Sequence, residues 1–336
     1  MESEGNVVDL YDWMVGFTFE AMYVMCFNED AGMMRTGTPH PVLNYMELSN
    51  KCLPMSAAFP ILRQYGHLVP IAAISDPYKA TLKWKEFTMS KVDEARFLPN
   101  KTPFLARLVD TEDESLGRPL NYSEATEEVM GLLFAGSGTT ATTMIYLLYE
   151  LAQIPDFQTR LYEELCTVPS SKDGVPNYQD IRGLPLLQAL INETLRRHPA
   201  IVGTLPRIAE IDMVVEGVAV PRGTEMSMSN LTHHFDPSIY PEPYSFHPDR
   251  WIVPEAQADK LKGAYSPFGV GPRNCIGQSY SICEMQILIA MLVYRFTFAL
   301  TDRMKVADMT PFDLFTGIPK AGMLELIIKE RESRTK

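Results

Sequence analysis

The ten residues 268–277 combine several glycines with one cysteine and one arginine. Glycines let the backbone pass close to a flat or bulky ligand. Cys275 lies just before a predicted helix, whose dipole and unpaired N–H groups stabilise a thiolate, the metal-binding form of sulfur. Arg273 suits a carboxylate on the same ligand. A glycine-rich turn with a buried structural cysteine is the alternative for a lone cysteine, and the ten-position pattern favours the metal site.

A long uninterrupted helix is predicted over 123–153, on the order of 45 Å at about 1.5 Å per residue, with the Ser123 hydroxyl as its cap. Its uncharged stretch 129–149 is long enough for a membrane span. However, residues 136–143 are mostly small or hydroxylated, and Glu stands on both flanks in place of the Lys or Arg that anchor spans. We therefore expect a helix buried in a protein core, with room for a ligand against its centre.

The remaining pattern changes from helices to short strands along the chain. Short β-like runs with turns follow residue 199, as at 212–220, and 236–254 is proline-rich coil. This order predicts a mainly α, α+β fold in one domain over 1–336. Helical spacing is expected over 7–27, 41–96 (interrupted by prolines 54, 60, 70 and 77), 156–166, 178–198 and 278–296.

Charge and cysteine content exclude several classes of protein. Acidic residues outnumber basic ones by 42 to 30, a net charge of −12, which argues against nucleic acid or an anionic membrane as the main partner. The five cysteines include no C-x-x-C pair, so we expect free thiols in a reducing compartment. The first residues carry neither a basic nor an apolar signal region, and no secretory signal is expected.

With its spacing F-x-x-G-x-R-x-C-x-G, the loop 268–277 resembles the signature of the cytochrome P450 haem-thiolate monooxygenases. The resemblance implies that Cys275 is the axial ligand of the iron of haem b and that Arg273 binds a haem propionate. A thiolate ligand pushes electron density onto iron and favours O–O cleavage. By the same resemblance, further cofactor contacts are expected at Phe268, Gly269 and Gly277.

Other stretches resemble this family in the order in which the family has them. Glu193 and Arg196 match its E-x-x-R helix motif, and 246–251 resembles its companion motif, whose arginine here is Arg250. The resemblance implies that these three residues are structural. Taken alone, an i, i+3 pair also fits a solvated helix face. Arg207, after Pro206, resembles the second propionate contact.

The segment 135–140 in the long helix resembles the family's oxygen-activation motif, A/G-G-x-D/E-T-T. The resemblance implies that Ala135 and Gly136 lie against the cofactor and that Thr139 is catalytic. Gly138 replaces the family's acid, so proton delivery is expected to run through Thr139 and water. Small residues for close helix packing are the alternative interpretation.

The resemblance also implies a substrate pocket above the haem. The segments 132–134, 201–205 and 312–318 are expected to line it, and their apolar composition predicts an apolar small molecule, such as a terpenoid, polyketide or other natural-product intermediate. Electrons are expected from NADPH through a flavoprotein reductase, with O2 as co-substrate, in the style of fungal secondary-metabolism members. The expected location is the cytoplasm or the periphery of the endoplasmic reticulum. The pocket residues are expected to be Leu132, Phe134, Val202, Thr204 and Phe315.

The resemblance covers roughly the carboxyl-terminal two thirds of the family's fold. We expect this chain to lack the membrane anchor and the early helices, one of which grips the haem in the family. Two hypotheses follow. The intact cysteine loop favours an active monooxygenase, whereas the missing front favours a truncated, catalytically incomplete relative with exposed apolar surface.

Overall fold

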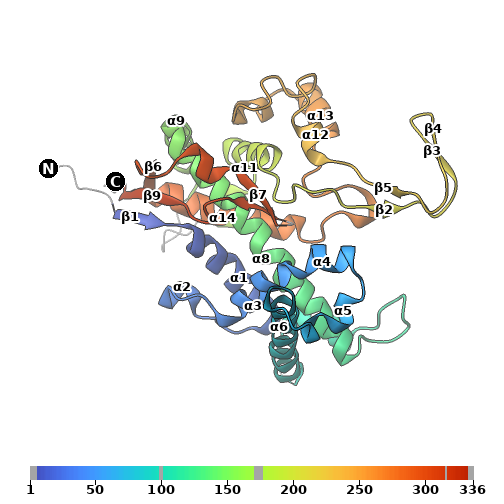
Figure 1. Ribbon diagram of the computed structural model, residues 1–336. Coiled ribbons are helices and arrows are strands. Elements are labelled where there is room, and N and C mark those ends of the chain that lie inside the picture. Colours follow the sequence, from blue (N-terminus) through green and yellow to red (C-terminus); the bar gives the residue numbers. More distant parts are fainter. Residues whose placement is uncertain (1–5, 98–100, 170–176, 315, 332–336) are drawn as a thin grey trace. The chain divides into compact units, whose positions relative to one another are not determined.

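The computed structural model describes residues 6–97, 101–169, 177–314 and 316–331, which fall into two compact units (Figure 1). Asp9–Ala141 forms the helical unit. Met1–Val8 with Thr142–Lys336 forms the cysteine unit, which contains Cys275. The predicted mainly α, α+β fold is confirmed by long helices and small antiparallel sheets, whereas a single domain over 1–336 stays a prediction.

Helices make up the helical unit. α3 packs against α6, and both bury apolar side chains, among them Met46 and Trp84. The bounds are α1 Tyr11–Phe27, α2 Met33–Thr36, α3 Pro41–Asn50, α4 Cys52–Ala58, α5 Leu62–Tyr65, a 3₁₀ helix Gly66–Leu68, α6 Ala72–Arg96, α7 Pro103–Asp110 and the first part of α8 Tyr122–Gln153.

Two of the four prolines expected to interrupt residues 41–96 lie inside helices. Pro54 belongs to the first turn of α4, where the backbone N–H has no partner within the helix to lose. Pro77 lies within α6 and is buried, so packing there offsets the lost hydrogen bond. Pro60 and Pro70 lie in breaks between helices, as predicted.

The segment 7–27 was expected to be helical throughout, and its first residues are a strand instead. β1 Asn6–Asp9 joins the edge of a sheet of order β1-β9-β6. The β-branched pair Val7 and Val8 suits a strand. Helix α1 begins at Tyr11, whose N–H donates to Oδ1 of Asp9 at 2.9 Å.

The long helix α8 has 32 residues. The predicted cap by Ser123 is wrong, because the helix has already begun at Tyr122. Asn121 caps it instead. The N–H of Glu124 donates to Oδ1 of Asn121 at 3.1 Å, and the N–H of Asn121 donates to Oε2 of Glu124 at 2.8 Å. This reciprocal pair satisfies two N–H groups at the start of the helix.

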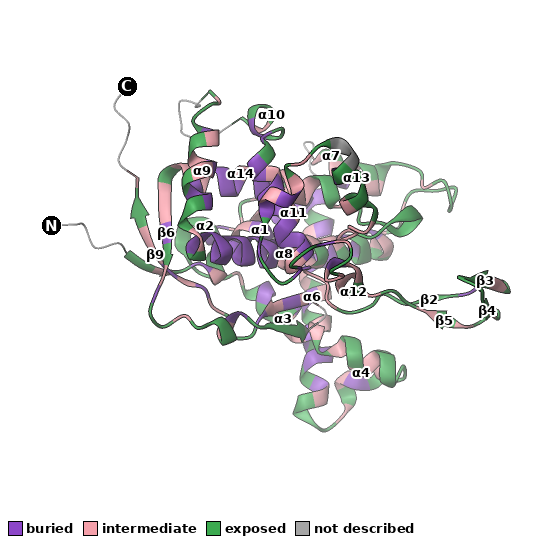
Figure 2. Ribbon diagram, turned by 90° about the horizontal axis from the view of Figure 1, so that it is seen from above, coloured by how far each residue is buried: buried purple, intermediate pink, exposed green. Residues whose placement is uncertain are grey.

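Packing decides between the two interpretations of α8. Within the described ranges it is the one helix long and apolar enough to cross a membrane, and 61% of its apolar window is buried inside the protein (Figure 2). The hydroxyl of Thr18 on α1 donates to the carbonyl oxygen of Ser137 at 2.9 Å. A Cβ added at Gly136 would collide with Met22 of α1. These contacts favour the core helix over the membrane span.

The cysteine unit contains α11, most of which is buried, and α14, whose buried residues lie between 284 and 293 (Figure 2). The predicted helix 178–198 is split into α10 and α11. The N–H groups of Leu186 and Leu187 donate to the carboxylate of Glu164 at 2.8 and 3.0 Å, which caps α11 anew. The bounds are α9 Pro155–Leu165, α10 Tyr178–Ile181, α11 Pro185–Arg197, α12 Asn230–His234, α13 Glu255–Gly263, α14 Gln278–Arg295, and 3₁₀ helices Pro248–Trp251, Gly271–Arg273 and Val306–Met309.

The short strands of the cysteine unit pair as antiparallel ribbons. The predicted turn inside 212–220 is confirmed: Glu216 and Gly217 have φ values of 47° and 80°, as a tight hairpin requires. In Figure 1 this hairpin extends beyond the ribbon of β2 and β5. The strands are β2 Arg207–Ile208, β3 Met213–Val215, β4 Val218–Val220, β5 Glu225–Met226, β6 Phe296–Leu300, β7 Pro311–Leu314, β8 Thr316–Pro319 and β9 Glu325–Glu330.

One carboxyl group in α14 is buried without a polar partner. Glu284 is 6% exposed, and neither carboxylate oxygen has a hydrogen-bond partner among the described residues. Burial raises the pKa of Glu284 to about 8. The folded protein therefore holds this group in its neutral form at pH 7.

We expect Glu284→Gln to remove a pH-dependent loss of stability. The folded-state pKa is raised, so the contribution of this group to stability is greatest below the unfolded pKa near 4.5 and is lost as the pH rises through about 8. At pH 8 the variant should exceed the wild type by on the order of 3 to 5 kcal/mol, since one pKa unit corresponds to about 1.4 kcal/mol. Urea unfolding from pH 4.5 to 9 measures this difference. The exposed Glu163→Gln is the control, and parallel pH profiles for wild type and Glu284→Gln would contradict the prediction.

Candidate functional site

The loop 268–277 forms a tight turn ahead of α14. The N–H of Cys275 donates to the carbonyl oxygen of Phe268 at 2.8 Å, and the N–H of Gly269 donates to that of Ser266 at 3.0 Å. Gly269 and Gly271 have φ values of 72° and 75°, in the left-handed region that favours glycine. The backbone thus requires these glycines, and they hold Cys275 three residues before α14.

The thiol of Cys275 lies on an exposed apolar surface. Cys275 is free and exposed, and its neighbours Ile276 and Val270 are 91% and 76% exposed. Apolar side chains gathered in this way indicate a surface that a ligand or partner covers. The alternative of a buried structural cysteine is not supported.

Both arginines expected to bind acidic groups are exposed in the cysteine unit. Arg273 has no carboxylate partner among the residues that the structure describes. Arg207 opens β2, and its Nη1 donates to the carbonyl oxygen of Pro206 at 2.9 Å. Neither guanidinium is neutralised by a described acidic side chain, so both suit an anionic ligand.

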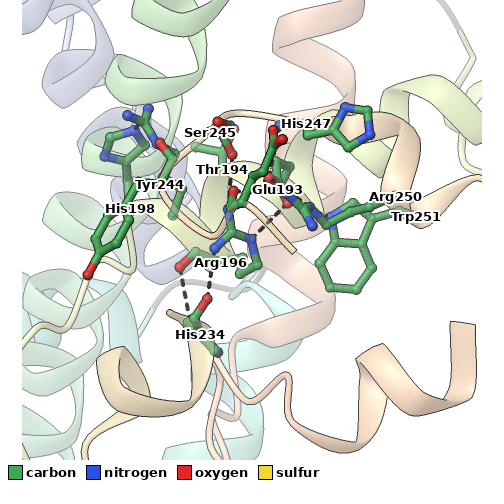
Figure 3. Close-up of polar contacts among 12 residues, drawn as sticks. Glu193, Thr194, Arg196, His198, His234, Tyr244, Ser245, His247, Arg250 and Trp251 are labelled. Atoms are coloured by element: carbon green, nitrogen blue, oxygen red, sulfur yellow. Dashed lines mark hydrogen bonds and ion pairs between the residues drawn. The ribbon is translucent and has the colours of Figure 1, made fainter. Parts of the chain in front are cut away.

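The carboxylate of Glu193 on α11 is the centre of a polar network (Figure 3). Its Oε1 accepts from Nη2 of Arg196 at 2.8 Å and from Nε of Arg250 at 3.1 Å. Its Oε2 accepts from Nε of Arg196 and Nε1 of Trp251, both at 2.9 Å. The backbone N–H of His247 donates to Oε1 at 2.9 Å. The structure therefore brings together the three residues expected to form a structural network.

This network keeps Glu193 charged in spite of its burial. Burial alone would raise the pKa of Glu193, but the hydrogen bonds and charge of Arg196, with the charge of Arg250, outweigh it and lower that pKa. Arg250 also donates to the carbonyl oxygen of Pro241 at 2.9 Å, and Arg196 to that of His234 at 2.7 Å. The network thus joins α11 to the coil 236–254.

A second buried charge cluster was missed by the sequence analysis. Glu150 of α8 is 2% exposed, pairs with Arg197, and lies 2.8 Å from Nε2 of His198. His198 stacks on Tyr146 with ring centroids 4.2 Å apart. The signal was present in the sequence, because Glu150 is the one charged residue in the second half of α8.

The expected residues of the 135–140 motif lie on α8 in the helical unit. The hydroxyl of Thr139 donates to the carbonyl oxygen of Ala135 at 2.7 Å. Gly136 faces Met22, which gives it a packing reason independent of any cofactor. A Cβ added at Gly138 would meet nothing within 4 Å. The site roles of Ala135, Gly136 and Thr139 stay predictions.

Two of the three expected pocket segments meet in the cysteine unit. The N–H of Gly317 in β8 donates to the carbonyl oxygen of Ala200 at 2.8 Å, and a Cβ at Gly317 would lie 2.7 Å from Cγ1 of Val202. Val202 and Gly317 line a cavity of about 270 Å³ that His198 also borders. Thr204 is exposed.

The other expected pocket residues belong to the helical unit or lie outside the described residues. Leu132 and Phe134 lie on α8 in the helical unit, where both are half-buried. There the Phe134 ring lies 6.1 Å from that of Trp84. Phe315 lies outside the described residues. The pocket as a whole therefore stays a prediction.

Comparison with known proteins decides the family. The family model described as Cytochrome P450 matches residues 1–326. The chain belongs to the cytochrome P450 family. Among solved structures, a cytochrome P450DA heme domain superposes with a TM-score of 0.82 at 21% identity, over 98% of this chain and 70% of that one. This likeness confirms the P450 fold.

Curated relatives are longer than this P450 chain. Cytochrome P450 3A12 of Canis lupus familiaris is 28% identical over 309 residues, covering 88% of this chain and 60% of the relative. Trichothecene C-15 hydroxylase of Fusarium sporotrichioides is 26% identical over 300 residues, with the same coverage of 88% and 60%. The chain thus spans about three fifths of the length of these relatives.

The described residues of this P450 chain fit a haem group. Cys275 offers a soft sulfur donor on an exposed loop, as iron in a haem-thiolate site requires. Ile276 and Val270 expose apolar surface beside it, and Arg273 and Arg207 lack described acidic partners. The sulfur donor suits the iron, the apolar surface suits the ring, and the cationic groups suit the propionates.

We expect Glu193→Ala to destabilise this P450 strongly. Removing the carboxylate leaves Arg196, which is 0% exposed, without its charge partner. Breaking a buried ion pair in this way costs about 3 to 5 kcal/mol. The free energy of unfolding in urea is the measurement. Glu124→Ala is the matched control. The carboxylate of Glu124 also accepts from two nitrogens of an arginine, Nη1 and Nη2 of Arg118, but this pair lies at the surface. Equal losses in the two variants would show that burial does not govern the effect.

Proposed function

We propose that this chain is a haem-thiolate monooxygenase that oxidises an apolar small molecule with O2 and electrons derived from NADPH. The observation that carries the proposal is the exposed Cys275 thiol, held by a glycine-dependent turn ahead of α14 in a chain of the P450 family. A haem-thiolate group, when bound, supplies the activation of O2. The chain supplies the sulfur ligand, the orientation of the ring and the protons.

Residues of the cysteine loop would hold the haem b. The Cys275 sulfur would bind the iron from its place just before the 18-residue helix α14. Arg273 and Arg207 pair with the propionates through their forked donors. Phe268, Gly269 and Gly277 lie against the ring, where the glycines allow close approach.

Proton delivery would run through Thr139 and water. The Thr139 hydroxyl donates to the carbonyl oxygen of Ala135 in the helix, and a hydroxyl oxygen that donates in this way also has the chemistry to accept from water. Gly138 carries no side chain that could replace the acid usual at this position. We therefore expect proton delivery to be inefficient in this chain.

The substrate would be an apolar natural-product intermediate. Leu132, Phe134 and Val202 offer apolar surface, Thr204 offers a hydroxyl, and Phe315 is expected to complete the pocket. A role in fungal secondary metabolism is supported by relatives such as the Fusarium trichothecene hydroxylase and a Penicillium roqueforti P450 monooxygenase, although insect and mammalian P450s match as well.

The electron donor would be an NADPH-dependent flavoprotein reductase. Lys260 and Lys262 on α13 offer basic groups to an acidic partner. The protein would work in the cytoplasm or at the periphery of the endoplasmic reticulum, where such a reductase is reached.

A catalytically incomplete relative is the second candidate. Ile208, Val214 and Val218 on the ribbons of the cysteine unit are 67%, 70% and 65% exposed. Apolar surface of this kind is costly at about 25 cal/mol per Å² and indicates that a further element covers it. The measured haem content of the chain separates the two candidates.

We expect Cys275→Ser to abolish the red-shifted Soret band that marks thiolate ligation in the reduced, carbon monoxide-bound protein, because serine offers no soft donor. The matched control is Cys283→Ser, which should keep the band. Cys283 is half-buried and lies in α14, eight residues after Cys275. Absorption spectroscopy with a pyridine haemochromogen assay gives both readouts. A band that survives Cys275→Ser, or is lost with Cys283→Ser, would refute the assignment. A wild-type chain that binds no haem would support the incomplete relative.

We expect Gly138→Glu to raise the amount of product formed per NADPH. The space around Gly138 admits a side chain, since an added Cβ meets nothing within 4 Å. General acid assistance is typically worth about 10²- to 10⁴-fold in rate, and here it competes with release of peroxide. Product and peroxide per NADPH are measured side by side, with Gly138→Gln as the control of equal size and no acid. Equal yields in wild type and both variants would count against the prediction.

A further inference from the structure

His234 at the end of α12 lies between the Glu193 network and the cysteine loop. It is fully buried, with 0% exposure. Its Nδ1 lies 3.1 Å from the carbonyl oxygen of Arg196, a contact drawn in Figure 3. The backbone N–H of Ser266, two residues before the loop 268–277, points to its Nε2 at 3.2 Å. One imidazole therefore contacts both elements.

The two partners determine the protonation of this imidazole. A carbonyl oxygen only accepts, so Nδ1 must carry the proton that it donates to Arg196. A backbone N–H only donates, so Nε2 must be unprotonated to accept from Ser266. Burial, with the charges of Arg196 and His233, lowers the pKa of His234 to about 4, against the opposing bond to the Arg196 carbonyl. The ring is thus neutral and a single tautomer at physiological pH.

Packing sets the orientation of the ring. Tyr265, which precedes Ser266, stacks on His234 with centroids 5.6 Å apart and an angle of 27°. Tyr265 also packs on Trp251, at 4.7 Å, and Trp251 donates to Glu193. From the other side, Nη1 of Arg196 donates to the carbonyl oxygen of His234 at 2.7 Å. Two reciprocal bonds therefore join Arg196 and His234.

Hydrogen bonds continue from Ser266 to the sulfur-bearing residue. The carbonyl oxygen of Ser266 accepts from Gly269 at 3.0 Å, and that of Phe268 accepts from Cys275 at 2.8 Å. The Ser266 hydroxyl also donates to Oδ1 of Asn230 on α12 at 3.1 Å. The backbone at Ser266 is the point from which the turn around Cys275 is held.

We propose that His234 is a positioning residue that ties the cysteine loop to the buried Arg196 and so sets the place of Cys275. This rests on the proposed role of Cys275 as a ligand. The imidazole suits the task because it is a donor and an acceptor at fixed, separate positions on one rigid ring. Phenylalanine would keep the stacking and lose both bonds, whereas the glutamine amide also has a donor and an acceptor.

The first test reads the tautomer in the wild-type chain. Nitrogen-15 NMR of the histidine-labelled protein, assigned with His234→Gln, should show His234 as the neutral Nδ1–H form between pH 6 and pH 8. A neutral Nε2–H form would overturn the proposal, because that tautomer cannot accept from Ser266. A charged ring in this range would overturn it for the same reason.

The second test reads the loop itself by hydrogen exchange, without any need for bound haem. His234→Phe should speed exchange in peptides covering 264–277 roughly five- to tenfold, the effect of one lost hydrogen bond, and leave peptides covering 186–195 of α11 unchanged. His234→Gln should restore most of the protection. His233→Gln, on the half-buried neighbouring histidine, should change nothing.

The outcomes separate this inference from the proposed function. Unchanged loop exchange in His234→Phe would overturn the inference and leave Cys275 as the ligand. Equal acceleration throughout the cysteine unit, without rescue by His234→Gln, would show a merely structural histidine and would also overturn it. Retention of the thiolate band in Cys275→Ser would refute the proposed function, whatever the exchange experiment shows.

Discussion

The charge of Glu193 is the constraint on which much of the cysteine unit depends. A carboxylate with no exposed surface is tolerated only if charged and polar donors surround it, and here five donor groups do so. Those donors come from α11 itself and from the segment 247–251, which includes the 3₁₀ helix Pro248–Trp251. The carboxylate thereby holds this segment to α11.

The cysteine loop depends on this arrangement indirectly, through Arg196 and His234. Arg196 donates to Glu193 with two nitrogens and to the carbonyl oxygen of His234 with the third. The His234 ring donates to the carbonyl oxygen of Arg196. Ser266 then contacts the other ring nitrogen. An exposed thiol on a glycine-rich turn would otherwise have little to hold it, since glycine is the residue with the most backbone freedom. The buried network is thus connected by hydrogen bonds to the turn that carries the exposed Cys275 thiol.

The small residues of α8 that match the oxygen-activation motif also pack against α1. Gly136 admits Met22 of α1, and the carbonyl oxygen of Ser137 accepts from Thr18, so this part of the helix is shaped by packing. Gly138, two residues on, faces open space. Packing against Met22 therefore explains the glycine at position 136, whereas no contact among the described residues requires a glycine at position 138. Sequence similarity to a motif does not distinguish a glycine required by packing from one that packing does not require, because only the structure shows the neighbours.

The sequence by itself determined the family, the helical character, the cysteine loop and the residues of the Glu193 network, because these depend on local spacing and on residue types that few other sites combine. It did not find His234, the Glu150 cluster, the Asn121 cap or the strand at Asn6–Asp9. Pro54 and Pro77 were misjudged because the cost of a proline depends on its place in the helix and on packing across it. The partners of His234 lie 38 residues back and 32 residues forward in the chain. Contacts at such separations exist only once the chain has folded, so tertiary structure alone decided them.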